Sequence, residues 1–239
     1  MERYIRQIPI IGEEGQKRLK KSTVTVVGVG GLGSAVVLYL TAAGVGNLIL
    51  VDGDRVALSD LNRQVIHWTE DIGSLKVNST MYKLKKLNPE VSIESIPVKL
   101  DEDNAKEYVK KSDLVIDCLD NWKTRFILNR ICVQERKPFI HAGVHGIYGQ
   151  LLVVLPGKSA CLRCILPEPP EERTVPILST TPGILGLLEA MEAIKILTGY
   201  GKPAINYLII FDGFTLNLEK IPVRRREDCP VCGSLTLSQ

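Results

Sequence analysis

Residues 26–37, VVGVGGLGSAVV, join a run of β-branched apolar residues to a helical pattern through closely spaced glycines. Gly28, Gly30 and Gly33 have the spacing G-x-G-x-x-G. A glycine-rich turn ahead of a helix lets backbone N–H groups and the helix dipole meet phosphate oxygens. The third glycine allows the helix to pack closely on the strand. The segment therefore predicts a strand, a nucleotide-binding turn and a helix.

The alternation of apolar runs and helical patterns continues through the first 140 residues. It predicts an α/β fold with a Rossmann-like, mostly parallel sheet and helices on both faces. Strands are expected at 23–28, 47–52, 91–98, 113–117 and 138–142, and helices at 32–43, 74–87, 103–111 and 122–136. After Gly143 the pattern indicates antiparallel strands at 147–155, 205–211 and 214–221, a helix at 184–198 and a proline-rich surface loop over 167–182.

The overall composition excludes several classes of protein. The chain has 239 residues, of which 45% are hydrophobic, and a net charge of +3. That charge is small and interleaved, so we expect no nucleic-acid partner. The sequence contains neither a signal peptide nor an apolar stretch of membrane-spanning length, so we expect a cytoplasmic protein without a membrane partner.

A carboxylate lies where a Rossmann site would hold a ribose. Asp52 ends the second predicted strand 19 residues after Gly33, which by itself favours NAD. The next 25 residues, however, carry Arg63, Gln64 and Lys76, and cations beside the glycine turn suit a triphosphate. Each cation could also be a solvated helix charge.

Asp120 follows the predicted strand 113–117, at the carboxyl edge where open α/β sheets bind ligands. A single carboxylate there suits Mg²⁺, which shares its coordination shell with phosphate oxygens. The alternative is that Asp120 is the N-cap of the helix predicted at 122–136.

Four of the six cysteines form two C-x-x-C pairs. Pairs with this spacing are typical of a tetrahedral Cys₄ zinc site, and in a reducing compartment they favour metal over disulfides. No further ligand is apparent nearby, so the predicted zinc is structural. The predicted ligands are Cys161, Cys164, Cys229 and Cys232.

Taken together, these motifs resemble the ubiquitin-activating-enzyme-like adenylyltransferases, the MoeB/ThiF/HesA group. The resemblance runs from RYxRQ near the N-terminus to the last C-x-x-C. The shared motifs are RYxRQ (3–7), GxGGLG (28–33), AGVGNLxLVDxD (43–54), LNRQ (61–64), DxGxxK (71–76), DCxDN (117–121), CxRC (161–164), AMEAIKxLTG (190–199) and CxxCG (229–233).

The resemblance implies that the nucleotide is ATP and that AMP is passed to a carboxylate. It implies that Asp52 holds the ribose, that Arg63 and Lys76 hold phosphates, that Asp120 binds Mg²⁺ and that Arg6 reaches into the partner's site across a homodimer. The expected catalytic residues are thus Arg6, Arg63, Lys76 and Asp120. The expected nucleotide contacts are Gly28, Gly30, Gly31, Gly33, Asp52, Asp54, Asn62, Arg63, Gln64, Lys76 and Asp120.

The implied substrate is a small ubiquitin-like sulfur carrier ending in Gly-Gly, used in molybdopterin, thiamine or thiolation pathways. We expect one adenylation domain over 1–239, with a nucleotide-binding half (1–145) and a carrier-binding and zinc half (146–239). Residues 141–150, HAGVHGIYGQ, carry three glycines that suit a narrow channel for the diglycine tail. His141 and His145 in this segment are expected to be local hydrogen-bonding residues.

The chain departs from the family pattern in two places. Residues 165–228 contain no cysteine, whereas many relatives use one there to form a thioester or acyl-persulfide. We therefore expect catalysis to stop at the acyl-adenylate, which sulfide or a separate sulfur-donor protein then attacks. Asp60 also stands where relatives usually have asparagine, which we expect to alter contacts near the γ-phosphate.

Three alternatives remain open from the sequence. An NAD-dependent oxidoreductase would use the glycine turn and Asp52 but leave Arg6, Arg63, Lys76 and the cysteine pairs unexplained. A degenerate scaffold would bind a ubiquitin-like protein without activating it. A tRNA-modifying dehydratase of the same superfamily is the third alternative, which the weak basic charge disfavours.

Overall fold

One eight-stranded sheet organises the computed structural model, which describes residues 2–171 and 175–235. The strand order is β3-β2-β1-β4-β5-β6-β7-β8. The first five strands pair in parallel, and β6, β7 and β8 extend the sheet in antiparallel fashion from β5. The strands are β1 (Thr23–Val27), β2 (Asn47–Val51), β3 (Ser92–Ile96), β4 (Leu114–Asp117), β5 (Phe139–His145), β6 (Tyr148–Val154), β7 (Tyr207–Asp212) and β8 (Asn217–Pro222).

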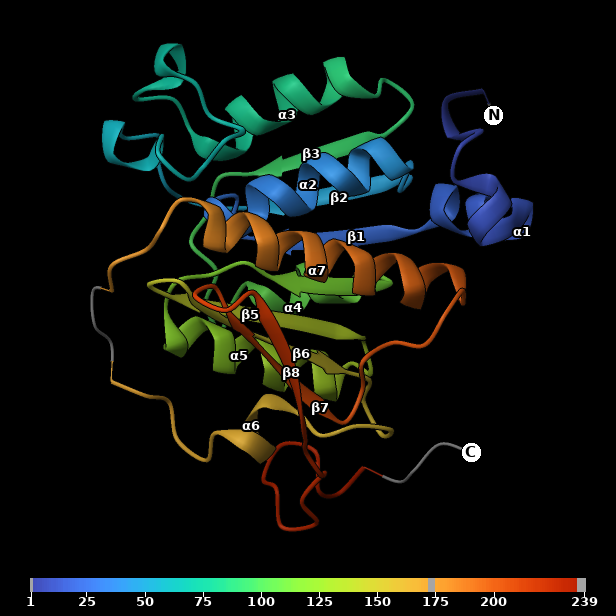
Figure 1. The fold of residues 1–239 in the computed structure, drawn as a ribbon, viewed down its shortest axis with the longest axis vertical. Coiled ribbons are helices and arrows are strands. Elements are labelled where there is room, and N and C mark those ends of the chain that lie inside the picture. Colours follow the sequence, from blue (N-terminus) through green and yellow to red (C-terminus); the bar gives the residue numbers. More distant parts are fainter. Residues whose placement is uncertain (1, 172–174, 236–239) are drawn as a thin grey trace.

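Helices cover both faces of the sheet (Figure 1). One hydrophobic core lies between the sheet and α2 and α7, and a second lies beneath α4 and α5. The helices are α1 (Ile8–Lys21), α2 (Gly31–Ala43), α3 (Lys76–Leu87), α4 (Ala105–Lys110), α5 (Trp122–Gln134), α6 (Leu162–Ile165) and α7 (Thr180–Thr198). Within the described residues, none of these helices is long and apolar enough to cross a membrane.

The predicted fold class is confirmed, with strand and helix positions close to those expected. Three helices differ from the expectation, and one of them is the short α6, which no predicted helix covers. The sequence pattern did not predict α1, which is interrupted at Gly12 (φ +75°) and buries few apolar side chains. Helix α7 begins at Thr180 and so includes the end of the predicted loop over 167–182, of which residues 172–174 lie outside the described chain.

A buried carboxyl group lies where α7 packs against the sheet. Glu189 is fully buried, and its Oε2 lies 3.6 Å from the Sγ of Cys118, which follows β4. Its Oε1 has no hydrogen-bond partner among the described residues. Burial, and secondarily the carboxylate of Asp117, raise the pKa of Glu189 well above its ordinary value. The folded protein therefore favours the neutral acid.

Glu189→Gln is expected to stabilise the protein increasingly as pH rises. With its pKa raised, folded Glu189 keeps a proton that the unfolded chain releases above about pH 4. Wild-type stability is consequently lost as pH rises through the interval between the unfolded and folded pKa values. Glutamine carries no charge and avoids this loss. Denaturant unfolding at pH 4 and pH 8 measures the difference.

The matched control is Glu192→Gln, on the same helix. The Glu192 carboxylate accepts hydrogen bonds from Lys195 Nζ at 2.5 Å and from the backbone N–H of Ala204 at 2.8 Å, so this substitution should lower stability. An identical pH dependence in wild type and Glu189→Gln would contradict the neutral state of Glu189.

Candidate nucleotide-binding site

A cavity of about 620 Å³ opens at the carboxyl ends of the parallel strands. It lies where β1 has β2 on one side and β4 on the other, the point at which the strand order reverses. Open α/β sheets bind ligands at this position. The cavity lining includes the predicted residues Gly28, Gly30, Gly31, Asp52, Asp54, Arg63, Gln64, Lys76 and Asp120.

The glycines of the turn serve two different purposes. A Cβ on Gly28, whose φ is +91°, would lie 2.6 Å from the carbonyl oxygen of Cys118. A Cβ on Gly33 would lie 2.1 Å from the carbonyl oxygen of Gly28, so this residue permits the close helix packing that the sequence predicted. Gly30 and Gly31 instead open onto the cavity at the N-terminus of α2.

Asp52 follows β2 and is fixed by the backbone around it. Its Oδ2 accepts a hydrogen bond from the N–H of Val29 at 2.9 Å, and its Oδ1 accepts one from the N–H of Asp54 at 2.8 Å. Burial raises the pKa of Asp52, while these two hydrogen bonds oppose the rise. Each carboxylate oxygen keeps a second lone pair for a ligand hydroxyl.

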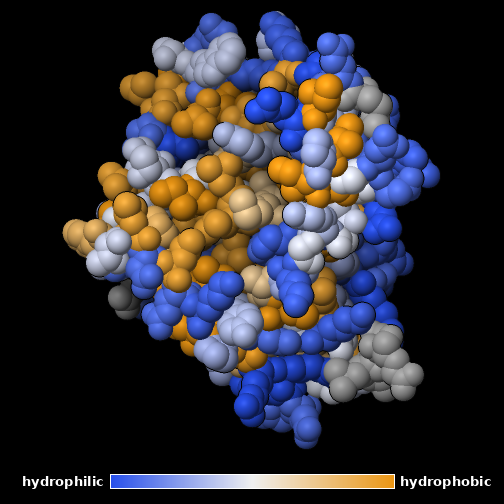
Figure 2. Space-filling view, turned by 45° about the vertical axis from the view of Figure 1, so that its right-hand side comes forward, coloured by the Kyte–Doolittle hydropathy of each residue, from blue (hydrophilic) through white to orange (hydrophobic). Residues whose placement is uncertain are grey.

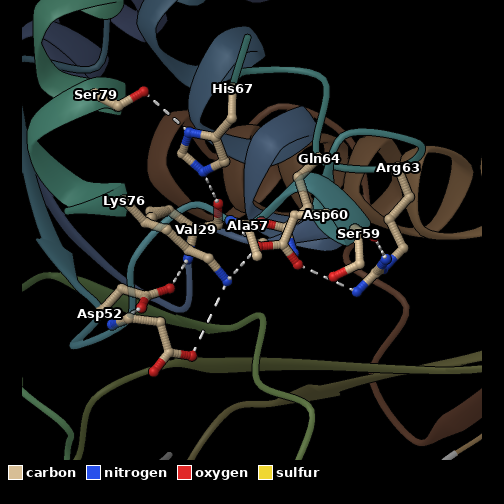
Figure 3. A network of polar contacts seen from close by, with 12 residues as sticks. Val29, Asp52, Ala57, Ser59, Asp60, Arg63, Gln64, His67, Lys76 and Ser79 are labelled. Atoms are coloured by element: carbon tan, nitrogen blue, oxygen red, sulfur yellow. Dashed lines mark hydrogen bonds and ion pairs between the residues drawn. The ribbon is translucent and has the colours of Figure 1, made fainter. Parts of the chain in front are cut away.

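Two predicted phosphate-binding cations lie beside the turn (Figure 3). Lys76, the first residue of α3, has a side chain only 9% exposed, and its Nζ lies 3.5 Å from Asp60 and 4.0 Å from Asp54. Arg63 Nη2 lies 3.5 Å from Asp60. Neither cation is therefore a freely solvated helix charge, which was the alternative interpretation of both.

The neighbours of Arg63 orient its guanidinium. Its Nη1 donates to the carbonyl oxygen of Ser59 at 2.8 Å and to Oδ1 of Asn62 at 3.0 Å. Asn62, a predicted nucleotide contact, is exposed outside the cavity lining and contacts Arg63 instead. Gln64, in contrast, is buried and lines the cavity.

Asp120 lies on the opposite wall of the cavity, after β4. The alternative that it caps the following helix is wrong. The N-cap is Asn121, whose Oδ1 accepts a hydrogen bond from the N–H of Thr124 at 2.9 Å. Asp120 is exposed to the cavity, and its carboxylate fits a role as a Mg²⁺ ligand.

The structure adds a buried cation that sequence reasoning did not identify. Arg125, on α5, lines the cavity and donates to the carbonyl oxygen of Ala142 at 3.1 Å, with Asp117 at 3.8 Å. Asp117 Oδ2 also forms a hydrogen bond with Nδ1 of His141, at 2.7 Å. His141 is fully buried, and desolvation lowers its pKa although Asp117 opposes this. The contacts of His141 agree with its expected local hydrogen-bonding role.

The predicted channel segment forms the end of β5, a turn and the start of β6. Gly143, Gly149 and His145 line the cavity. A Cβ on Gly149 would lie 2.4 Å from Leu185, so this glycine is also required for packing against α7. Gly146, with φ +62°, forms the turn.

Arg6 does not lie at the cavity of its own chain. The adjacent Gln7 donates to the carbonyl oxygen of Ala43 at 2.8 Å, at the C-terminal end of α2. The cavity lies at the other end of this 13-residue helix, about 20 Å away. Any contact between Arg6 and a nucleotide thus requires a second chain.

The four predicted zinc ligands form a second, separate cluster. Their sulfur atoms all lie within 4.8 Å of one another and are buried. The Sγ–Sγ distances are 3.9 Å for Cys161–Cys164, 3.7 Å for Cys161–Cys229 and 3.3 Å for Cys164–Cys232. Four sulfurs at about 2.3 Å from a tetrahedral Zn²⁺ lie about 3.8 Å apart. The cluster therefore fits a metal ion.

Comparison with known proteins agrees with this architecture. A SAMP-activating enzyme E1 of Haloferax volcanii is 41% identical over 241 residues, covering 98% of this chain and 89% of the relative. A sulfur carrier protein adenylyltransferase of Thermus thermophilus is 42% identical over 246 residues, covering 98% and 91%. The solved structure of Escherichia coli MccB with AMPCPP and MccA shares the fold, with a TM-score of 0.89 and 24% identity over 97% of this chain and 74% of that chain.

The family model described as ThiF family matches residues 2–231. This match covers almost the whole sequence, from the first predicted motif into the last C-x-x-C pair. Together with relatives above 40% identity over nearly their full length, it shows that the chain belongs to the ThiF family.

Proposed function

We propose that this protein uses ATP to adenylate the C-terminal glycine carboxylate of a small ubiquitin-like sulfur carrier, releasing pyrophosphate. The observation that carries the proposal is the position of Lys76 and Arg63 beside the glycine turn, in one cavity with Asp52. The names of the relatives support it, since they are adenylyltransferases and activating enzymes of such carriers. An NAD-dependent oxidoreductase has no use for these cations.

The cavity residues take roles that follow from their chemistry. Asp52 accepts hydrogen bonds from the ribose hydroxyls, while Arg63 and Lys76 offset the negative charge of the phosphates. Gly30 and Gly31 allow the phosphates to approach the N-terminus of α2. Attack of a carboxylate on a phosphoryl group joins two anions, so positioning and charge neutralisation matter more than proton transfer.

Asp120 would hold Mg²⁺, which supplies additional positive charge at the phosphates when bound. Arg6 would contact the nucleotide of a partner chain, which makes the active form a homodimer. Apolar side chains gather on one face of the molecule (Figure 2). Among the large apolar residues, Ile5, Ile10 and Met191 are each more than half exposed. Such surfaces favour a protein partner.

The carrier tail would enter beside residues 141–150, and the carrier itself would contact the half formed by 146–239. Residues 165–228 offer no thiol, so the reaction of this chain would end at the acyl-adenylate. A separate sulfur donor, or sulfide, would then attack it. The clustered arrangement of four cysteines suits a metal ion in a reducing compartment, which supports a cytoplasmic location.

Lys76→Ala is expected to lower carrier-dependent exchange of pyrophosphate into ATP by about 10² to 10³. This is the range for removing one preorganised contact to a developing charge. The control is Lys111→Ala, because Lys111 forms a surface ion pair with Glu107 at 2.8 Å and precedes β4, near the amino ends of the strands, whereas the cavity lies at their carboxyl ends. It should change the rate less than about twofold.

Wild-type exchange rates in a folded Lys76→Ala protein would contradict the assigned role of Lys76. Absence of exchange in the wild type with every diglycine carrier of the same cell would contradict the proposed function itself.

The cysteine cluster is proposed to hold one structural Zn²⁺ per chain. Cys164→Ser is expected to lose the metal and to lower the thermal midpoint, because a structural site contributes its binding energy to folding. Metal analysis and thermal unfolding of both proteins measure this. Cys132→Ser is the control, because Cys132 is buried but outside the cluster. Equal metal content in wild type and Cys164→Ser would refute the assignment.

A further inference from the structure

Asp60 occupies the centre of the group of cations. Its side chain is only 12% exposed, and both oxygens are engaged (Figure 3). Oδ2 accepts a hydrogen bond from the backbone N–H of Ala57 at 3.0 Å, and Oδ1 accepts one from Nε2 of Gln64 at 2.9 Å. Two cations face the same carboxylate, with Arg63 Nη2 3.5 Å from Oδ1 and Lys76 Nζ 3.5 Å from Oδ2.

The hydrogen bonds and the ion pairs of Asp60 have different effects. The hydrogen bonds to Ala57 and Gln64 are of ordinary length and fix the carboxylate. The two 3.5 Å separations exceed the usual length of a charge-assisted hydrogen bond, about 2.7–2.9 Å. Arg63 Nη2 and Lys76 Nζ are therefore held electrostatically near Asp60, and the N–H groups on these two atoms remain available to a ligand.

The position of Asp60 indicates which part of a nucleotide it would affect. Lys76 lies between Asp52 and Asp60, and Arg63 lies on the far side of Asp60 (Figure 3). A nucleotide with its ribose at Asp52 would direct its outer phosphates toward Asp60 and Arg63. A carboxylate at that end repels these phosphates and competes with them for the same two cations.

We propose that Asp60 is a positioning residue that holds Arg63 and Lys76 in place. Its charge also lowers the affinity of the site for the two outer phosphates, so that pyrophosphate is released readily. This inference rests on the proposed function, because it assigns the outer phosphates to this end of the cavity. The α-phosphate, nearest the ribose, would be affected less.

Asp60→Asn tests the charge with little change in shape. The Oε1 of Gln64 is buried and has no hydrogen-bond partner within the described residues. If the Gln64 amide turns over, the introduced asparagine side chain can donate to this oxygen and still accept from the N–H of Ala57. The variant therefore removes the negative charge and keeps the number of hydrogen bonds.

Asp60→Asn should bind pyrophosphate and ATP about tenfold more tightly than the wild type, a change of about 1.4 kcal/mol. The affinity for AMP, which lacks the outer phosphates, should change less than about twofold. Asp60→Ser provides a second variant, since its hydroxyl can still accept from the N–H of Ala57 without carrying charge. Calorimetric titration with the three ligands and Mg²⁺ measures these affinities without any carrier.

A purely structural role for Asp60 would change the affinities for AMP, ATP and pyrophosphate by similar factors, and this result would overturn the inference. Weaker pyrophosphate binding by both folded variants would also overturn it, because loss of cation positioning would then outweigh loss of the repulsion between Asp60 and the outer phosphates. If wild-type protein binds neither ATP nor pyrophosphate, the proposed function fails together with this inference. If the wild type binds ATP and pyrophosphate but the variants do not bind them more tightly, only this inference fails and the proposed function is unaffected.

Discussion

The candidate site depends on one close packing contact, between the start of α2 and the turn that follows β1. Because Gly33 has no side chain, α2 approaches the carbonyl oxygen of Gly28 more closely than any Cβ would permit. This contact directs the N-terminus of α2 into the cavity. Gly186 extends the same arrangement to α7, since a Cβ there would lie 2.4 Å from the carbonyl oxygen of Leu32. The position of the nucleotide pocket thus follows from packing within the core.

Electrostatic compensation is the second organising feature of the molecule. Each buried or half-buried cation of the cavity has a carboxylate nearby: Lys76 and Arg63 share Asp60, and Arg125 faces Asp117. Burying a charge without a partner costs free energy. These pairs therefore stabilise the positive groups of the cavity in the absence of a ligand. In our proposal, Asp60 also limits how strongly the cavity binds the outer phosphates.

Local patterns in the sequence were sufficient to predict most of the strands and helices of the fold. Apolar periodicity located the strands, and the spacing of motifs after strand ends located Asp52, Arg63, Lys76 and Asp120, all of which line the cavity. Helix α1 was missed because Gly12 interrupts it and it buries few apolar side chains.

Interactions between distant segments were not predictable in this way. Arg125 was overlooked because its partners, Asp117 and the carbonyl of Ala142, come from two other elements. Likewise Asp60 was visible only as a departure from a family pattern. Its contact with Lys76, 16 positions further along the chain, became apparent only in the folded structure.

The most direct test of the account is intact-mass analysis of a diglycine carrier from the same cell after incubation with this protein, ATP and Mg²⁺. If this protein adenylates the carrier, the carrier gains the mass of one adenylyl group, and a carrier lacking its final glycine gains none. If each such carrier retains its original mass while ATP is bound, transfer of AMP to a carrier carboxylate is not what this protein does.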